Sequence, residues 1–342
     1  MNSKKVLVTG GAGYIGVHTA VALVQAGWEP VIVDDLSRSH ISLIEGAEKI
    51  VGRKISFHKV DCNDRAQLRK VFRENNDITS VIHFAAFKSV NESVQQPLTY
   101  YRNNIGSLLT VLEVMKEFSV TRLIFSSSCT VYGQPDQIPV TEEAPFKKAE
   151  SPYGATKQIC ERILEDETTA RKELRVVSLR YFNPIGAHPS SHIGELPIGI
   201  PNNLVPFITQ TAIGKRNQLT VYGADYNTPD GSCLRDFIHI VDLAQAHVKA
   251  LQKIDELSHP FEPVNLGTGK PVSVLELVKI FTQVNGVPLN YTIGPRRTGD
   301  IEKVYADPTK SLALLDWKAE LTIEDALRDA WRWEKKLDDA AH

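Results

Sequence analysis

The sequence has few cysteines and no pattern that pairs them. Cys62, Cys129, Cys160 and Cys233 are scattered along the chain, and none belongs to a Cys-x-x-Cys motif. This spacing predicts reduced thiols, as in a cytoplasmic protein, and neither a disulfide framework nor a zinc site. We therefore expect no bound metal.

The sequence also lacks long apolar runs and an excess of either charge. No apolar run approaches the roughly 20 residues that cross a bilayer. The strand pattern that begins near Val6 leaves no room for a signal peptide. A net charge of −2 gives no electrostatic reason to bind nucleic acid or an anionic membrane. These absences predict a cytoplasmic protein with neither kind of partner.

What is present is an ordinary globular composition. Of the 342 residues, 42% are hydrophobic and 23% are charged, so the chain can build a sizeable core. A chain of this length predicts one large domain or two.

The first 35 residues follow the pattern of a dinucleotide site. Residues 5–9 read as a buried strand, glycines recur through residues 10–16, and residues 17–26 read as a helix. A second strand, 30–33, ends at Asp34. Glycines alone could make only a tight turn, but strand, glycine turn, helix, strand and a closing acid together are the context that a dinucleotide requires.

The chemistry of this stretch explains the pattern. Gly10, Gly13 and Gly16 let the backbone approach a pyrophosphate, and the helix start supplies free N–H groups and a positive dipole. Asp34 can accept hydrogen bonds from the adenosine ribose and would repel a 2′-phosphate. We therefore expect NAD as the cofactor, in preference to NADP.

Strands and helices continue to alternate along the first half of the chain. The predicted strands are 55–60, 80–84, 122–125 and 175–180, and the predicted helices are 66–74, 98–118 and one opening at residues 151–153. Repeated strand–helix units predict an α/β fold, a Rossmann-type doubly wound parallel sheet.

After Asn183 the regular alternation is lost. Gly, Pro and His crowd residues 186–203, and the later elements form a mixed pattern. We expect an NAD-binding Rossmann domain over residues 1–183, with returning segments near 236–267. A smaller, mixed C-terminal substrate domain is expected over residues 184–342.

Tyr153 and Lys157 are four residues apart and should share one side of a helix. A fixed ammonium one turn away is expected to lower the pKa of the phenol towards the working pH. Such a pair is common by chance, and Ser128 in a serine-rich turn could be merely structural. Together, at the carboxyl edge of an NAD-binding sheet, the three predict oxidation of a secondary alcohol.

The sequence resembles the extended short-chain dehydrogenase/reductase family, and within it the UDP-glucose 4-epimerases. The resemblance runs from Lys5 to about Trp333. The stretches shared across the family are residues 8–16, 81–86, 125–128, 151–154 and 180–183. Those more specific to this branch are residues 199–204, 235–239 and 295–300.

The resemblance implies epimerisation at C4 of a UDP-hexose. Tyr153 takes the proton of the 4-hydroxyl, Lys157 bridges the nicotinamide ribose and lowers the pKa of Tyr153, and Ser128 bonds the reacting oxygen. Hydride passes from C4 to NAD and leaves a 4-keto sugar. The sugar then rotates about its bonds to the diphosphate, and the hydride returns to the opposite face of C4. NAD is not consumed and should be tightly bound.

The resemblance also implies the binding residues, and it makes residues 184–342 the UDP-sugar-binding domain. Cofactor positions are Gly10, Gly13, Tyr14, Ile15, Gly16, Asp34, Asp61, Lys88, Asn103, Tyr153 and Lys157. Substrate positions are Ser128, Asn183, Asn203, Leu204, Tyr222, Arg235, Arg297, Asp300 and Val304. Arginines suit a diphosphate because they give it forked, charge-assisted hydrogen bonds.

Two positions depart from the family. Cys129 stands where the family often has Ala, and we expect no role for it. Val304 stands where relatives carry a bulky Tyr or a small Cys near the sugar 2-position. Because Val leaves more room than Tyr, UDP-GlcNAc and UDP-GalNAc are expected as additional substrates.

Three other classes of function fit the sequence less well. A 4,6-dehydratase or decarboxylase needs an extra acid or acid/base pair beside Ser128, where this chain has Cys129 and Thr130. An NAD-consuming dehydrogenase would leave the UDP motifs unexplained. A non-catalytic NAD-binding sensor typically loses the tyrosine or the lysine that correspond to Tyr153 and Lys157.

The resemblance further implies a homodimer, formed by the helices near 98–118 and 153–167.

Overall fold

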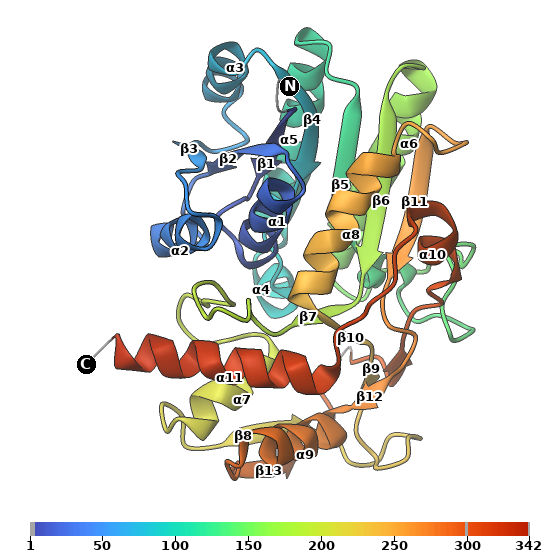
Figure 1. Ribbon diagram of the computed structural model, residues 1–342. Helices are drawn as coiled ribbons and strands as arrows, with labels where there is room; N and C mark the ends of the chain where they lie inside the picture. The colour runs from blue at the N-terminus through green and yellow to red at the C-terminus, as the bar shows by residue number, and fades with distance from the viewer. Residues whose placement is uncertain (1–3, 298–299, 341–342) are drawn as a thin grey trace.

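The fold is built on a seven-stranded sheet whose strands are all parallel, as a computed structural model of residues 4–297 and 300–340 shows (Figure 1). The motif residues Thr298 and Gly299 lie outside the described ranges. In spatial order the strands are β11 (Phe261–Leu266), β6 (Arg175–Tyr181), β5 (Arg122–Ser128), β4 (Ile78–His83), β1 (Lys5–Thr9), β2 (Glu29–Asp34) and β3 (Ser56–Lys59).

Helices cover both faces of this sheet. Helices α1 (Tyr14–Gln25) and α8 (Ile240–Lys253) pack on the face that carries Val6 and Val8. The opposite face, which carries Leu7, holds α3 (Arg65–Glu74), α5 (Pro97–Glu117) and α6 (Pro152–Ala170). Strands buried on both faces are nearly continuous apolar runs, as the sequence shows. The predicted doubly wound Rossmann-type fold is confirmed.

Among the described residues, three small sheets lie beyond the carboxyl ends of the long strands (Figure 1). They pair β7 (Asn183–Ile185) with β10 (Phe237–His239), β8 (Leu219–Tyr222) with β13 (Tyr291–Gly294), and β9 (Leu234–Arg235) with β12 (Val272–Ser273) and β14 (Lys303–Val304). Helices α7 (Leu204–Ala212), α9 (Val274–Asn285) and α11 (Ile323–Asp339) close a separate apolar core around them.

The chain passes between the two regions more than once. Strand β6 leads directly into β7, and the chain then returns through α8 and β11 to the large sheet. A short helix, α10 (Thr309–Leu315), packs on α8 and β11. Trp333 of α11 joins the apolar cluster that contains α1 and α2 (Ile41–Val51).

Two helices before β5 were not predicted. Helix α2 buries Leu43, Ile44 and Ala47, at a helical spacing that the sequence does contain. Helix α4 (Val90–Gln95) is only six residues long, too short for periodicity to reveal. In contrast, the start of α6 is confirmed: the Ser151 hydroxyl accepts from the Gly154 N–H at 3.1 Å, and Pro152 is the first helical residue. Within the described part of the chain, no helix is long and apolar enough to span a bilayer.

Candidate active site

The turn between β1 and α1 is shaped by its glycines. Gly10 has φ +66°, and a Cβ there would lie 2.7 Å from the backbone nitrogen of Ala85. At Gly13, which caps α1, a Cβ would meet only the carbonyl of Gly10 within 4 Å. The first N–H groups of a helix have no partners inside it, and Gly13 has no side chain to cap them. This open, electropositive helix end fits the pyrophosphate of a dinucleotide.

Asp34, at the end of β2, holds this turn in place. One of its carboxylate oxygens accepts from the Ala12 N–H at 3.0 Å. The other accepts from the Leu36 N–H at 2.9 Å and the Ser39 hydroxyl at 2.7 Å. Burial raises the pKa of Asp34, and these hydrogen bonds oppose the rise. The side chain therefore lies beside the glycine turn, where a ribose would be expected.

The remaining predicted cofactor residues follow β3 and β4 or lie on α5. Asp61 binds Asn63, and the Asn63 amide donates to the Asn103 side chain at 3.2 Å. The Lys88 ammonium lies 5.9 Å from the centre of the Tyr14 ring. These residues share the edge of the sheet that carries the glycine turn.

Ser128, Tyr153 and Lys157 meet at the carboxyl end of β5. Ser128 ends that strand and caps the short 3-10 helix η1 (Cys129–Tyr132) by accepting from the Thr130 N–H at 3.2 Å. The buried Lys157 ammonium donates to the carbonyl of Ser126 at 2.6 Å and lies 5.9 Å from the centre of the Tyr153 ring. The structure therefore brings the three predicted catalytic side chains together.

The pKa values differ from the sequence-based expectation. Burial raises the pKa of Tyr153 to about 12, and the hydrogen bond with Ser128 offsets this only in part. Burial also lowers the pKa of Lys157 to about 8. Loss of solvent therefore dominates the pKa of Tyr153 in the chain alone, which is opposite to the lowering by Lys157 that the sequence predicted.

A buried ion pair fixes the helix that carries Tyr153 and Lys157, and it was not predicted. Arg180 of β6 and Glu161 of α6 lie 2.6 Å apart, and both are less than 5% exposed. The Glu161 carboxylate also accepts from the hydroxyls of Ser127 and Ser178, on β5 and β6. A single sequence shows these residues but not that they meet.

Replacing Glu161 with Ala is expected to lower the free energy of unfolding by about 3–5 kcal/mol, because it leaves Arg180 buried without a counter-charge. Thermal or denaturant unfolding measures the loss. Glu165→Ala is the matched control, since Glu165 forms an exposed pair with Arg162 on the same helix. Equal stability of the two variants would contradict the assigned role of Glu161.

A second cluster contains the predicted diphosphate residues. The Asp300 carboxylate lies 2.6 Å from the Arg297 guanidinium and 3.7 Å from that of Arg235. The Arg297 guanidinium lies 5.8 Å from the centre of the Tyr222 ring, which is 45% exposed at the end of β8. Two cations and an exposed aromatic ring thus gather at one place, as a uridine diphosphate requires.

The other predicted substrate residues lie on β7, α7 and β14. Asn183 begins β7, and its N–H donates to the carbonyl of Asp236 at 3.0 Å. Asn203 is the N-cap residue of α7, although its side chain makes no capping hydrogen bond, and Leu204 is the first residue of that helix. Val304 pairs with Arg235 between β14 and β9, and it packs in the apolar cluster that Cys129 adjoins.

Asp236 organises this region, although it was not among the predicted site residues. One carboxylate oxygen accepts from the N–H and the hydroxyl of Thr268, at 2.8 and 2.7 Å. The other accepts from the N–H groups of Gly269 and Ala306, at 3.0 and 3.1 Å. Asp236 thereby fixes the strands that carry Arg235 and Val304. The motif around Asp236 was visible in the sequence, but its four donors come from distant segments.

Comparison with known proteins agrees with the family that the sequence motifs predicted. The sequence profile described as the NAD dependent epimerase/dehydratase family matches residues 6–267, more than half of the chain. The chain belongs to this family. The matched part of this chain contains the glycine turn, Ser128 and the Tyr153–Lys157 pair.

Individual members of the family are similar over nearly their whole length. The UDP-glucose 4-epimerase of Dictyostelium discoideum is 50% identical over 330 residues, which cover 96% of this chain and 95% of that protein. A crystal structure of UDP-glucose 4-epimerase from Bifidobacterium longum in complex with NAD+ and UDP has a TM-score of 0.94 and 45% identity, covering 98% of this chain and 99% of that one.

The UDP-Glc/GlcNAc 4-epimerase from Campylobacter jejuni is a more distant member. Its structure has a TM-score of 0.83 and 33% identity, covering 98% of this chain and 100% of that one. The resemblance to UDP-glucose 4-epimerases that the motifs predicted is confirmed.

Proposed function

We propose that the chain is an NAD-dependent UDP-glucose 4-epimerase, which interconverts UDP-galactose and UDP-glucose. One observation carries this proposal: Ser128, Tyr153 and Lys157 meet at the sheet edge that holds the glycine turn. The cluster of Arg235, Arg297 and Tyr222 supports a UDP-linked substrate.

The cofactor is held by residues of the first half of the chain. The open end of α1 receives the pyrophosphate, Asp34 the adenosine ribose, and Lys157 the nicotinamide ribose. Tyr14, Ile15, Asp61, Lys88 and Asn103 complete the assigned contacts. When bound, NAD supplies a hydride acceptor for C4 of the sugar and a positive ring charge beside the phenol of Tyr153.

The chain's own side chains move the proton. Tyr153 accepts the proton of the sugar 4-hydroxyl as a phenolate, the form that the positive ring charge of bound NAD would favour, and Ser128 hydrogen-bonds the same sugar oxygen while its charge changes. Tyr153 then returns the proton to that oxygen after the sugar has presented its opposite face. Arg235 and Arg297 hold the diphosphate while the sugar rotates. The residues that flank the diphosphate are Asn183, Asn203 and Leu204.

Turnover by the purified protein without added NAD tests the proposal. We expect UDP-galactose to be converted to UDP-glucose, resolved by chromatography, because the cofactor is regenerated in every cycle. Absence of turnover, even after NAD is added, would contradict the epimerase and reopen the dehydratase and sensor alternatives.

We also propose UDP-GlcNAc and UDP-GalNAc as substrates, on the basis of Val304. This side chain is 5% exposed in the apolar cluster that Cys129 adjoins. Replacing Val304 with Tyr is expected to lower the ratio of UDP-GalNAc to UDP-galactose turnover about tenfold or more, since extra volume in a packed site costs on the order of 1–3 kcal/mol. Val304→Cys is the control and should keep the ratio. An unchanged ratio in Val304→Tyr would contradict the proposal.

The homodimer remains a proposal, supported by exposed apolar side chains on the two helices expected to form it. Leu98 and Leu109 of α5 are 75% and 44% exposed, and Ile159 of α6 is 39% exposed. Exposed apolar surface of this kind marks interfaces between proteins. Sedimentation analysis tests the proposal, and a purely monomeric protein would contradict it.

We propose the same division of the chain as the sequence suggested. Residues 1–183, with returning segments near 236–267, bind NAD, and residues 184–342 bind the UDP-sugar. Helix α10 packs against the first part and belongs with it structurally. A cytoplasmic location also stays a prediction, which fractionation of the cells that express the protein would test.

A further inference from the structure

Glu195 lies between the two halves of the site and has no role in the mechanism above. Its side chain is only 11% exposed. It precedes the segment 196–202, which leads to Asn203 and α7. Carboxylates are seldom buried without a partner, so the contacts of Glu195 indicate what it does.

The same carboxylate oxygen of Glu195 accepts from both halves. It lies 3.1 Å from the ammonium of Lys88, a residue assigned to the cofactor. It also accepts from the side-chain amide of Asn203, at 2.5 Å, a residue assigned to the UDP-sugar. The carboxylate thus joins the loop after β4 to the start of α7.

The charge of Glu195 also acts on Tyr14, the first residue of α1 and one of the assigned cofactor residues. Burial raises the pKa of Tyr14 well above its usual range, and the negative charge of Glu195 raises it further. The Tyr14 hydroxyl donates to the carbonyl of Gly186 at 2.6 Å, so Tyr14 itself is firmly placed. Glu195 therefore lies near two of the assigned cofactor residues, Tyr14 and Lys88.

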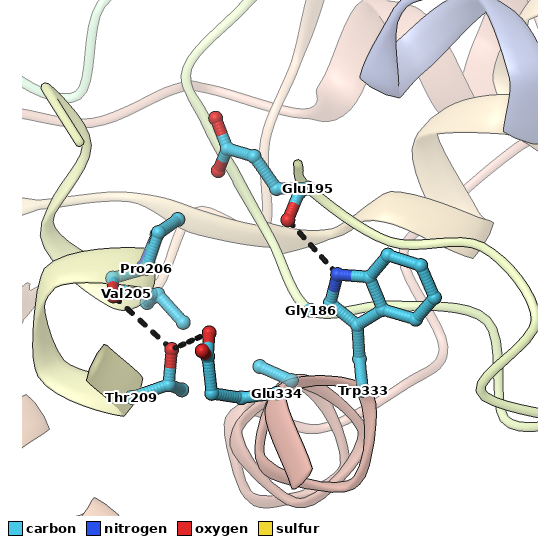
Figure 2. Close-up of a pocket in the computed structure, with 8 residues that line it drawn as sticks. Gly186, Glu195, Val205, Pro206, Thr209, Trp333 and Glu334 are labelled. Carbon is cyan, nitrogen blue, oxygen red and sulfur yellow. Dashed lines mark hydrogen bonds between the residues drawn. The ribbon is translucent and has the colours of Figure 1, made fainter. Parts of the chain in front are cut away.

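The backbone of Glu195 is anchored independently of its carboxylate. The indole N–H of Trp333, on α11, donates to the Glu195 carbonyl at 2.9 Å (Figure 2). Figure 2 shows this carbonyl directed at the indole while the carboxylate points away from it. A Cβ on Gly194 would lie 2.5 Å from the indole carbons, so the chain passes directly against the ring. The side chain can therefore be altered without removing this anchor.

We propose that Glu195 is a positioning residue that couples Lys88 on the cofactor side to Asn203 on the UDP side. The proposal rests on the function proposed above and deepens it. By accepting hydrogen bonds from both side chains, Glu195 fixes Asn203 at the start of α7 and holds the Lys88 ammonium near the ring of Tyr14. Affinity for UDP then depends on Lys88, although Lys88 is assigned to the other ligand.

The test is a double-mutant cycle on UDP binding, measured by calorimetry in saturating NAD. Glu195→Ala is expected to weaken UDP binding about tenfold, the order expected for lost hydrogen bonds to a charged group. Glu195→Gln keeps an oxygen acceptor and is expected to retain most of the affinity. Lys88→Ala should weaken UDP binding in the wild-type background and cause little further loss in Glu195→Ala.

Asp255→Ala is the matched control. Asp255 forms an ion pair with Arg122 at 2.7 Å, and Arg122 begins β5, at the edge of the sheet opposite the site. Its loss should leave UDP affinity unchanged. In turnover, Glu195→Ala should raise KM for UDP-galactose about tenfold and change kcat by less than about threefold, because a positioning residue acts on binding.

The outcomes separate this inference from the proposed function. Wild-type affinity in Glu195→Ala, or independent effects of Glu195→Ala and Lys88→Ala, would overturn the coupling while turnover by the wild type leaves the epimerase in place. If Glu195→Ala does not fold, the same cycle with Glu195→Leu decides: because Leu has no oxygen acceptor, the effect of Lys88→Ala should be reduced, and an unreduced effect would overturn the coupling. Lack of turnover by the wild type would instead contradict the proposed function.

Discussion

Tyr153→Phe is expected to lower kcat for UDP-galactose by about 10²–10⁴-fold, the usual contribution of a positioned acid–base group. The substitution removes one hydroxyl and keeps the ring, which lies half-buried in the first turn of α6. UDP binding should be unchanged, because the arginine cluster does not involve Tyr153. Kinetics and calorimetry on the same preparation measure both quantities.

Tyr291→Phe is the matched control, since Tyr291 is 43% exposed on β13. It should keep wild-type kcat. The two variants should also unfold at similar temperatures, which would separate loss of chemistry from loss of fold. Turnover by Tyr153→Phe within about tenfold of the wild type would contradict acid–base catalysis by Tyr153.

Lys157→Met is expected to lower kcat by about 10²-fold or more, because in the proposed mechanism the ammonium supports proton transfer and binds the nicotinamide ribose. The same substitution should not lower the free energy of unfolding. Burial lowers the pKa of Lys157 from 10.5 to about 8, so keeping the ammonium charged opposes folding below pH 8. The variant, which carries no charge, is expected to be at least as stable as the wild type at pH 7.

The sign of the pH dependence follows from the same shift. Between pH 8 and 10.5 the unfolded chain binds more protons at Lys157 than the folded chain, so this residue makes stability rise with pH across that window. Lys157→Met should lack that rise, measured by denaturant unfolding at matched NAD occupancy. Lys253→Met, at an exposed pair with Glu256, should keep it. A rise that persists in Lys157→Met would contradict the assignment.

Local sequence patterns predicted much of the fold and of the site. The glycine turn, the strand ends and the Ser151–Pro152 start of α6 depend on neighbouring residues, so periodicity and capping reveal them. The carboxyl edge of a parallel sheet then brings Ser128 towards Tyr153 and Lys157. The resemblance supplied the proposed UDP-sugar residues, and the structure brings two of them, Arg235 and Arg297, to Asp300.

The features that sequence could not predict depend on contacts between distant segments. The pKa of Tyr153 is set by burial, which spacing along a helix does not report. The partners of Glu161, Glu195 and Asp236 lie on other elements, and a single sequence does not show that they meet. Short elements such as α4 and β14 are held by packing and carry too few residues for a pattern.

In the proposed reaction, C4 of the sugar loses and regains the same hydrogen within one site. Turnover of UDP-galactose that carries deuterium at C4, by the purified protein in ordinary water without added NAD, tests this most directly. The expected product is UDP-glucose that retains the deuterium at C4, as mass spectrometry and NMR would show. Product that has lost the label to solvent would contradict it, and so would product labelled at another carbon.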